Sequence, residues 1–398
     1  MTAIIGVMNK HAVAIAADSA VTLGGGRKVL NSANKLFSLS KHHPVAIAIY
    51  GNADLVGTPW EIIIKEYRKN LKEKSFSNLK GYVDDFFAFI KGQQYYCSDS
   101  DYALNYLKGC IRGFCAILAN LNMDKNDLTR TFVNICNRNT DYLPGYSNNT
   151  IEFLKENISD ELDLVVKNLT IDGEEAKALL INLLVKGTIP EFFSGLVFVG
   201  YGKDEIYPSM YPCEVGCIIN GTLAIKEEPA KQISNSTQAS IMPFAQTDVM
   251  QTILDGISPQ IVSIYCNCLE QTLGMFTNQL ADAIKTNDPT LANQIRNIST
   301  SPFVQKFLKL SRDAQFNQYT KPFVDSVVNL EKEDLSDFAE SLITLTSMKR
   351  KISPNQETVG GPVDVMVISK GDGIIWMKRK HYFDAEKNHH FFSNYFEN

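Results

Sequence analysis

The chain has 398 residues with 44% hydrophobic and 21% charged side chains, a formal net charge of −5 and a pI near 5.8. A chain of this size can bury one large core or two modest ones. Its mildly acidic balance argues against nucleic acid or an anionic membrane as the main partner.

The N-terminal part of the chain has the pattern of short buried strands. One apolar run comes on either side of the polar turn Asn9-Lys10, and a later run ends at Gly51. Runs of this kind, bounded by turn residues, favour strands that are buried on one or both faces. We expect a break at the triple glycine 24–26, and strands at 3–8, 12–17, 28–30, 36–39 and 45–50.

A mainly helical region follows. Thr58-Pro59-Trp60-Glu61 has the form of a capping box with proline at the first helical position, so a helix should begin there. Segment 123–150 looks loop-like because 141–145 breaks it, and it could contain a strand at 131–136. Further helices are expected near 78–92, 99–122 and 151–187.

Strands return in the second half of the chain. Asn220-Gly221 is a strong hairpin signal directly after the apolar run at 217–219. From 246 to 350 the pattern is mostly helical, with interruptions at Asp288-Pro289 and Ser301-Pro302. We expect strands at 195–200, 217–219, 363–368 and 374–377, the last two joined by a turn at 370–373.

This order of elements predicts an α+β fold in which sheets are sandwiched between helical layers. Because strands at both chain ends should share sheets, we expect a single domain, 1–398, with helical insertions. An aromatic C-terminal tail should pack either on the body of the protein or on another subunit. The expected core is about 2–125, 190–256 and 358–380, with insertions at about 126–189 and 257–357 and the tail at 381–398.

The sequence also bears on location and on metals. The apolar run at 12–17 is too short for a signal peptide, and no stretch reaches the roughly 18 apolar residues that a membrane-spanning helix needs. We therefore expect a cytoplasmic protein. The eight cysteines lack paired metal-ligand spacing, so we expect free thiols, no metal site and no other cofactor.

Four motifs near the N-terminus resemble the opening of proteasome β subunits and of their bacterial relative that works with an ATP-driven unfoldase. They are MTAIIGV at 1–7, AIAADSAVT at 14–22, NKLF at 34–37 and IYGNAD at 49–54. The resemblance covers 2–56 and resumes at 195–227 and 360–378. It implies the N-terminal-nucleophile (Ntn) hydrolase fold, which is an αββα four-layer sandwich, with a threonine nucleophile exposed by removal of Met1.

The resemblance assigns three catalytic side chains. Thr2 matches the N-terminal threonine, Asp18 the aspartate at the end of the second strand, and Lys35 the lysine one hairpin later. A threonine hydroxyl needs an adjacent base, and the free α-amine of the same residue can serve, with a pKa of about 7.7–8.0. A nearby lysine ammonium would disfavour the charged amine, and Asp18 would fix Lys35 and compensate its charge.

The same resemblance assigns the contacts with substrate. The backbone N–H of Gly51 would stabilise the oxyanion, and the backbone of Thr22 would pair with an extended substrate as an added strand. Ser240 is the match for a serine that holds the N-terminus in the family, whereas the aspartate–serine pair expected before Gly360 is missing from 355–359. The specificity pocket would be apolar, which favours an apolar substrate side chain, and would be lined by Val21, Ala33, Phe37, Ile49 and Ala53.

The predicted function is therefore an N-terminal threonine hydrolase that cleaves amide bonds through an acyl-enzyme on Thr2, with peptides or unfolded protein as substrates. Two alternatives stay open, because a fold does not determine a substrate. One is an amidase that acts on a non-peptide substrate, and the other is a catalytically inactive structural or binding subunit. The resemblance also implies an ATP-dependent unfoldase or self-assembly as a partner.

Overall fold

The computed structural model describes residues 2–23, 28–93, 100–121, 123–137, 148–186, 189, 192–352, 359–381 and 383–390. Met1, the expected break at 24–26, the loop at 141–145, the segment 355–358 and half of the aromatic tail lie outside the described residues. The chain divides into two compact units, which are Met1–Ala245 with Glu331–Asn398, and Gln246–Leu330. The single domain with helical insertions stays a prediction.

One sheet of the first unit joins the two ends of the chain. Its strand order is β13-β1-β2-β14-β15, and neighbouring strands run antiparallel. All residues of β1, β2 and β14 are buried, which agrees with their mainly apolar sequence. The bounds are β1 Ala3–Asn9, β2 Val13–Ala17, β13 Ala239–Ala245, β14 Asp364–Ser369 and β15 Gly373–Lys378.

The second sheet has the order β11-β10-β9-β6-β5, and β12 pairs with β10 outside that path. The hairpin expected at Asn220-Gly221 is confirmed, since both residues have positive φ, 47° and 73°, as a tight turn between twisted strands requires. The bounds are β5 Leu36–Ser38, β6 Val45–Gly51, β9 Ser194–Gly200, β10 Ser209–Ile219, β11 Thr222–Glu227 and β12 Lys231–Gln232. Two small ribbons pair β3 (Val21–Leu23) with β4 (Lys28–Leu30), and β7 (Asp54–Leu55) with β8 (Thr58–Pro59).

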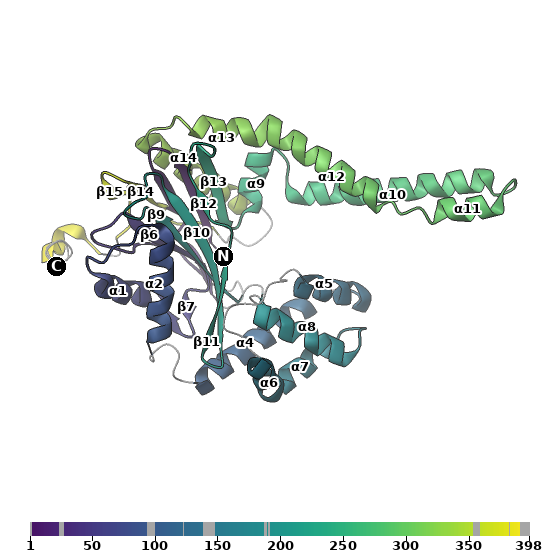
Figure 1. Cartoon of the computed structure of the whole chain (residues 1–398), viewed down its shortest axis with the longest axis horizontal. Coiled ribbons are helices and arrows are strands. Elements are labelled where there is room, and N and C mark those ends of the chain that lie inside the picture. Colours follow the sequence, from purple (N-terminus) through teal and green to yellow (C-terminus); the bar gives the residue numbers. More distant parts are fainter. Residues whose placement is uncertain are drawn as a thin grey trace. The chain divides into compact units, whose positions relative to one another are not determined.

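The two sheets pack face to face. Their shared core contains Ile4 and Ile15 from one sheet and Ala48 and Val199 from the other, all at most 1% exposed. Helices α1 (Trp60–Leu71) and α2 (Leu79–Gly92) cover the outer face of the six-stranded sheet through a second cluster, and Figure 1 shows α2 running alongside these strands. Helix α14 (Lys332–Ile352) packs on β1, β2 and β14 of the other sheet. The layers of this unit are thus helix, sheet, sheet and helix.

The start of α1 differs from the expected capping box. The helix begins at Trp60, close to where it was expected, but Pro59 is the N-cap residue and no side chain caps the helix. Thr58 lies instead in β8, where it pairs with Leu55. The capping-box interpretation is therefore wrong, because the threonine is held in a two-stranded ribbon.

Helices between residues 100 and 186 form a cluster of their own in the first unit. The expected loop at 123–150 and its strand at 131–136 are wrong across 125–137, which is helix α5. The buried residues Leu128, Phe132 and Cys136 recur every four positions and so share one face of that helix. Cys217 and Ile219 of β10 join the cluster to the six-stranded sheet. The helices are α4 Ser100–Ala119, α5 Lys125–Asn137, α6 Asn148–Asn157, α7 Ser159–Val166 and α8 Gly173–Lys186.

The second unit is helical. Ser258 and Asp288 accept hydrogen bonds from backbone N–H groups at the starts of α10 and α11, and proline occupies a first-turn position in both helices. The expected interruptions at Asp288-Pro289 and Ser301-Pro302 are confirmed as helix starts. Figure 1 shows α10 and α12 running side by side. The elements are α9 Asp248–Asp255, α10 Pro259–Ile284, α11 Pro289–Arg296, α12 Ser301–Gln315, the π-helix Phe316–Thr320 and α13 Lys321–Val327.

Two general properties of the chain also follow. Among the described helices, none combines the length and apolar character that crossing a bilayer requires. Seven cysteines within the described residues are free thiols, and those that are buried are Cys110, Cys136, Cys213 and Cys217.

Candidate active site

Asp18 is the centre of the candidate site. It follows β2 directly, and 1% of its surface is exposed. Its Oδ1 accepts hydrogen bonds from the Ala3 N–H at 2.9 Å and from Lys35 Nζ at 2.6 Å. Its Oδ2 accepts from the backbone N–H groups of Ala20 and Gly360, both at 3.1 Å. A buried carboxylate that accepts this many hydrogen bonds is held in one orientation.

Lys35 lies just before β5 and is 3% exposed. Its ammonium donates to Asp18 and, at 2.6 Å, to the Ala20 carbonyl. An ammonium has three donors, so within the described residues one N–H stays available to a further acceptor. Burial lowers the pKa of Lys35 from 10.5 to about 8, and the neighbouring Asp18 acts in the opposite direction. The charges of Lys380 and Asp364 also act on this pKa, the first lowering it and the second raising it.

Thr2 precedes β1 and is 6% exposed. The next residue, Ala3, donates its N–H to Asp18 and accepts from the Asp18 N–H at 3.2 Å. The carboxylate that binds the Lys35 ammonium therefore also holds the backbone one residue after Thr2. The structure thus brings Asp18 and Lys35 together at the start of β1, where Thr2 lies.

A segment from the far end of the chain closes the site. Besides the Gly360 N–H that reaches Asp18, the Gly360 carbonyl accepts from the Ser19 N–H at 3.1 Å. The Ser19 hydroxyl donates to the Pro362 carbonyl at 2.5 Å. Sequence reasoning did not identify Gly360 as a site residue. The signal was the Gly360-Gly361-Pro362 turn directly before a buried strand, a place where a backbone makes a close approach.

Gly51 ends β6 and has φ +74°, a conformation that favours glycine. A Cβ at this position would lie 2.3 Å from the carbonyl oxygen of Phe193, so only glycine fits. Two residues earlier, the Ile49 N–H donates to the Lys35 carbonyl at 2.9 Å. Gly51 thus lies roughly 7 Å along the strand from the residue that holds the Lys35 backbone.

Comparisons with known proteins give only distant likenesses. No protein-family model and no curated protein matches the sequence. Among solved structures, the chain is similar to a Gly-1 mutant of Anbu from Hyphomicrobium sp. strain MC1, with 9% identity, 100% of this chain and 94% of that chain covered, and a TM-score of 0.33. It is also similar to the helical assembly of the Anbu complex from Pseudomonas aeruginosa, with 10% identity, coverage of 99% and 93%, and a TM-score of 0.32.

A further similar structure is Anbu, described as an ancestral beta-subunit, from Yersinia bercovieri, with 9% identity, coverage of 98% and 94%, and a TM-score of 0.31. TM-scores of this size do not establish a shared fold. The assignment of the candidate site therefore rests on the contacts of Asp18, Lys35 and Gly360 in this chain.

The assignment of Ser240 to the site is wrong. In the antiparallel pairing of β1 with β13, Ala3 lies opposite Ala245 and Ser240 lies opposite Met8. Ser240 is therefore at the other end of β1 from Thr2, roughly 20 Å away along the strand. The register between two strands so far apart in sequence decided this position, and a local motif cannot reveal such a register.

The residues expected to bind substrate lie in three places. Phe37 and Ile49 are 8% and 7% exposed and belong to the cluster between the six-stranded sheet and α1 and α2. Val21 and Thr22 lie in the β3–β4 ribbon, opposite Leu30 and Val29, and the Ala33 N–H donates to the Ser19 carbonyl at 3.1 Å. Ala53 is exposed, and its carbonyl accepts from the Trp60 N–H at the start of α1. Their role in binding stays a prediction.

Across the described residues, no group of three or more histidine, cysteine, aspartate or glutamate side chains is placed to hold a metal ion. The chemistry available at Asp18 and Lys35 is that of a buried charge pair beside a hydroxyl-bearing residue.

We expect Gly51→Ala to destabilise the protein and to abolish any activity that depends on this turn. The variant forces an alanine into a positive-φ conformation, which costs about 1–2 kcal/mol, and places its Cβ against the Phe193 carbonyl. Gly221→Ala is the matched control, because φ is +73° there but nothing lies within 4 Å of the added Cβ. Urea unfolding should show a larger loss for Gly51→Ala. Equal losses would mean that the contact with Phe193 is not tight.

Proposed function

We propose that this chain is an N-terminal threonine hydrolase of the Ntn type, most closely comparable to proteasome-like peptidases. The observation that carries the proposal is the buried Lys35 ammonium, held by an Asp18 carboxylate that also fixes the backbone next to Thr2. The order of layers, helix, sheet, sheet and helix, supports the same assignment. An Ntn αββα sandwich has these layers and places its nucleophile at the start of a strand.

The proposed mechanism uses groups of this chain alone. Once Met1 is removed, the Thr2 α-amine accepts the proton of its own hydroxyl, and the oxygen attacks the amide carbonyl carbon. The Gly51 N–H stabilises the resulting oxyanion. The amine then passes the proton to the leaving nitrogen, and water hydrolyses the ester that stays on Thr2. The positive charge of Lys35 favours the neutral form of the amine, and Asp18 keeps that charge in place.

The proposed substrates are peptides or unfolded protein that bind as an extended strand along the Thr22 backbone, with an apolar side chain near Phe37 and Ile49. An ATP-dependent unfoldase or self-assembly is the proposed partner. Placement in the cytoplasm is part of the same proposal. The position of Ser240 far from Thr2 is the specific observation that favours the alternative, a catalytically inactive subunit.

Mass spectrometry with an electrophile tests the proposal. The intact mass should show a chain that begins at Thr2, and an epoxyketone should add once per chain, since it reacts with the amine and hydroxyl of one terminal threonine. Peptide mapping should place the adduct on Thr2. A variant with an uncleaved N-terminal extension is the matched control and should stay unmodified, because its amine is in a peptide bond. A processed chain that gains no adduct would favour the inactive subunit.

A further inference from the structure

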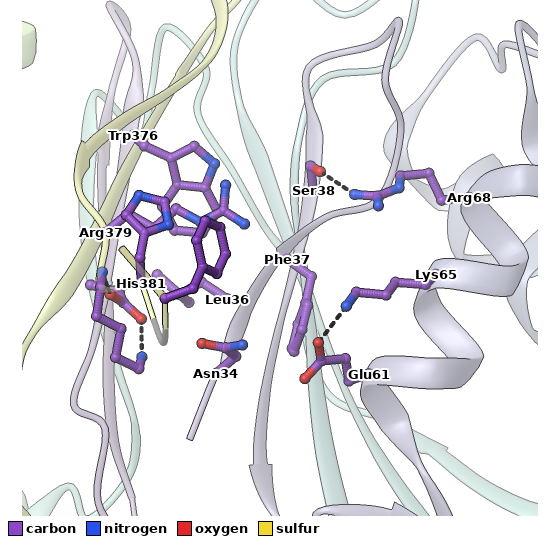
Figure 2. A pocket seen from close by; sticks show the side chains of 13 residues that line it. Asn34, Leu36, Phe37, Ser38, Glu61, Lys65, Arg68, Trp376, Arg379 and His381 are labelled. Carbon is purple, nitrogen blue, oxygen red and sulfur yellow. Dashed lines mark hydrogen bonds and ion pairs between the residues drawn. The ribbon is translucent and has the colours of Figure 1, made fainter. Parts of the chain in front are cut away.

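A cavity of about 120 Å³ lies at the open edge of the sandwich in the first unit. Its walls come from the edge strand β5, helix α1, the strands β14 and β15, and the segment directly after β15. Figure 2 shows Trp376, Arg379 and His381 on one side of the cavity and Glu61, Lys65 and Arg68 on the other. An engineered cavity of about 150 Å³ can hold a benzene molecule, so this one has room for about one ring.

One wall of the cavity is aromatic. The guanidinium of Arg379 lies over the Trp376 ring, 4.5 Å from its centroid, and the rings of His381 and Phe383 are 5.4 Å apart. On the opposite side Phe37 also lines the cavity. Flat aromatic faces and a stacked guanidinium favour a planar ligand over an aliphatic one.

The charges that line the cavity are unbalanced. Each carboxylate already has a partner, since Glu61 accepts from Lys65 at 2.5 Å and Asp364 forms an ion pair with Lys380. Arg68 and Arg379 also line the cavity, and Arg68 Nη1 donates to the Ser38 hydroxyl at 2.9 Å. Within the described residues Arg379 has no carboxylate partner. The lining cations are Lys65, Arg68, Arg379 and Lys380, and the lining anions are Glu61 and Asp364.

We propose that this cavity binds a single-ring aromatic anion, a carboxylate or a phosphate ester. The ring stacks beside Trp376, and the anionic group takes the hydrogen bonds that the Arg379 guanidinium offers. A guanidinium presents paired N–H donors whose geometry matches both kinds of anion. Neither Arg379 nor Trp376 takes part in the proposed hydrolysis, whereas Phe37 lines this cavity and also belongs to the proposed substrate pocket.

The cavity is nevertheless next to the candidate active site along the chain. Asn34 and Leu36 line it, and Lys35 lies between them in sequence. The ion pair of Lys380 and Asp364 at its wall acts on the electrostatics of Lys35. Binding is measured directly, so failure of this inference and failure of the proposed hydrolysis give different results.

Isothermal titration calorimetry tests the inference with benzoate and phenyl phosphate as probes, and with benzyl alcohol and inorganic phosphate as controls. We expect at least one aromatic anion to bind about tenfold or more tightly than either control. The tighter of the two anions identifies a carboxylate or a phosphate ester as the ligand chemistry. Equal binding of benzyl alcohol, or no binding of either anion at millimolar concentration, would overturn the inference.

Variants on opposite walls sharpen the test. Arg379→Gln should weaken binding of the preferred anion about tenfold or more, because it removes a charged hydrogen bond. Arg68→Gln, on the other wall, gives a second measurement should the first variant fold poorly. Arg130→Gln is the matched control, since Arg130 is an exposed arginine on α5 that does not line the cavity. The same affinity in Arg379→Gln, Arg68→Gln and the control would contradict the assignment.

Discussion

Replacing Thr2 by alanine should lower kcat/KM for amide hydrolysis by about 10⁴-fold or more, because no hydroxyl is left to attack the carbonyl. The measurement is the hydrolysis of a fluorogenic peptide with an apolar residue before the cleaved bond. The chain should still fold, since Thr2 precedes β1 and the backbone contact with Asp18 runs through Ala3. Thr2→Ala should also gain no epoxyketone adduct.

Thr2→Ser is the matched control for this loss. Serine keeps the hydroxyl and the α-amine and removes only a methyl group, so it should retain a measurable part of the activity. Both variants should show the same far-UV circular dichroism and the same unfolding midpoint within a few degrees. Hydrolysis that persists in Thr2→Ala at the wild-type rate would place the nucleophile elsewhere in the chain.

Replacing Asp18 by alanine should destabilise the protein by about 3–5 kcal/mol, because it leaves the Lys35 ammonium buried without its counter-charge. It also removes the acceptor of three buried backbone N–H groups, those of Ala3, Ala20 and Gly360. Urea unfolding followed by circular dichroism measures the loss. Asp18→Asn keeps the size and shape of the side chain and should therefore cost less stability, but it still leaves the lysine charge unpaired.

Two comparisons test whether burial of the ion pair causes this loss of stability. Glu66→Ala breaks the ion pair with Lys69, whose side chains are 49% and 74% exposed, and should cost at most about 1 kcal/mol. Combining Asp18→Asn with Lys35→Met removes both charges of the buried pair, and should recover part of the stability that Asp18→Asn loses. An Asp18→Ala protein as stable as Glu66→Ala would contradict the burial of this pair.

Several strands and one hairpin could be read from local sequence, whereas β13 and the first part of β10 were not predicted. The apolar runs that became β1, β2, β6, β9 and β14, and the Asn220-Gly221 hairpin, depend on patterns of a few neighbouring residues. The pairing of Asp18 with Lys35 was also expected, since the resemblance places the aspartate at the end of the second strand and the lysine one hairpin later. Helix α5 was missed because a short run of β-favouring residues suggested a strand. Its buried residues recur every four positions, which is the helical pattern.

What the sequence determined by itself is therefore the alternation of elements and the residue types that could form the site, Thr2, Asp18 and Lys35. Only the tertiary structure decided which distant segments meet there. Gly360 donates to Asp18 across 342 positions of sequence, and the β1–β13 register carries Ser240 away from Thr2. Both depend on the packing of whole sheets, because strand register is selected by the sum of many side-chain contacts rather than by any local motif.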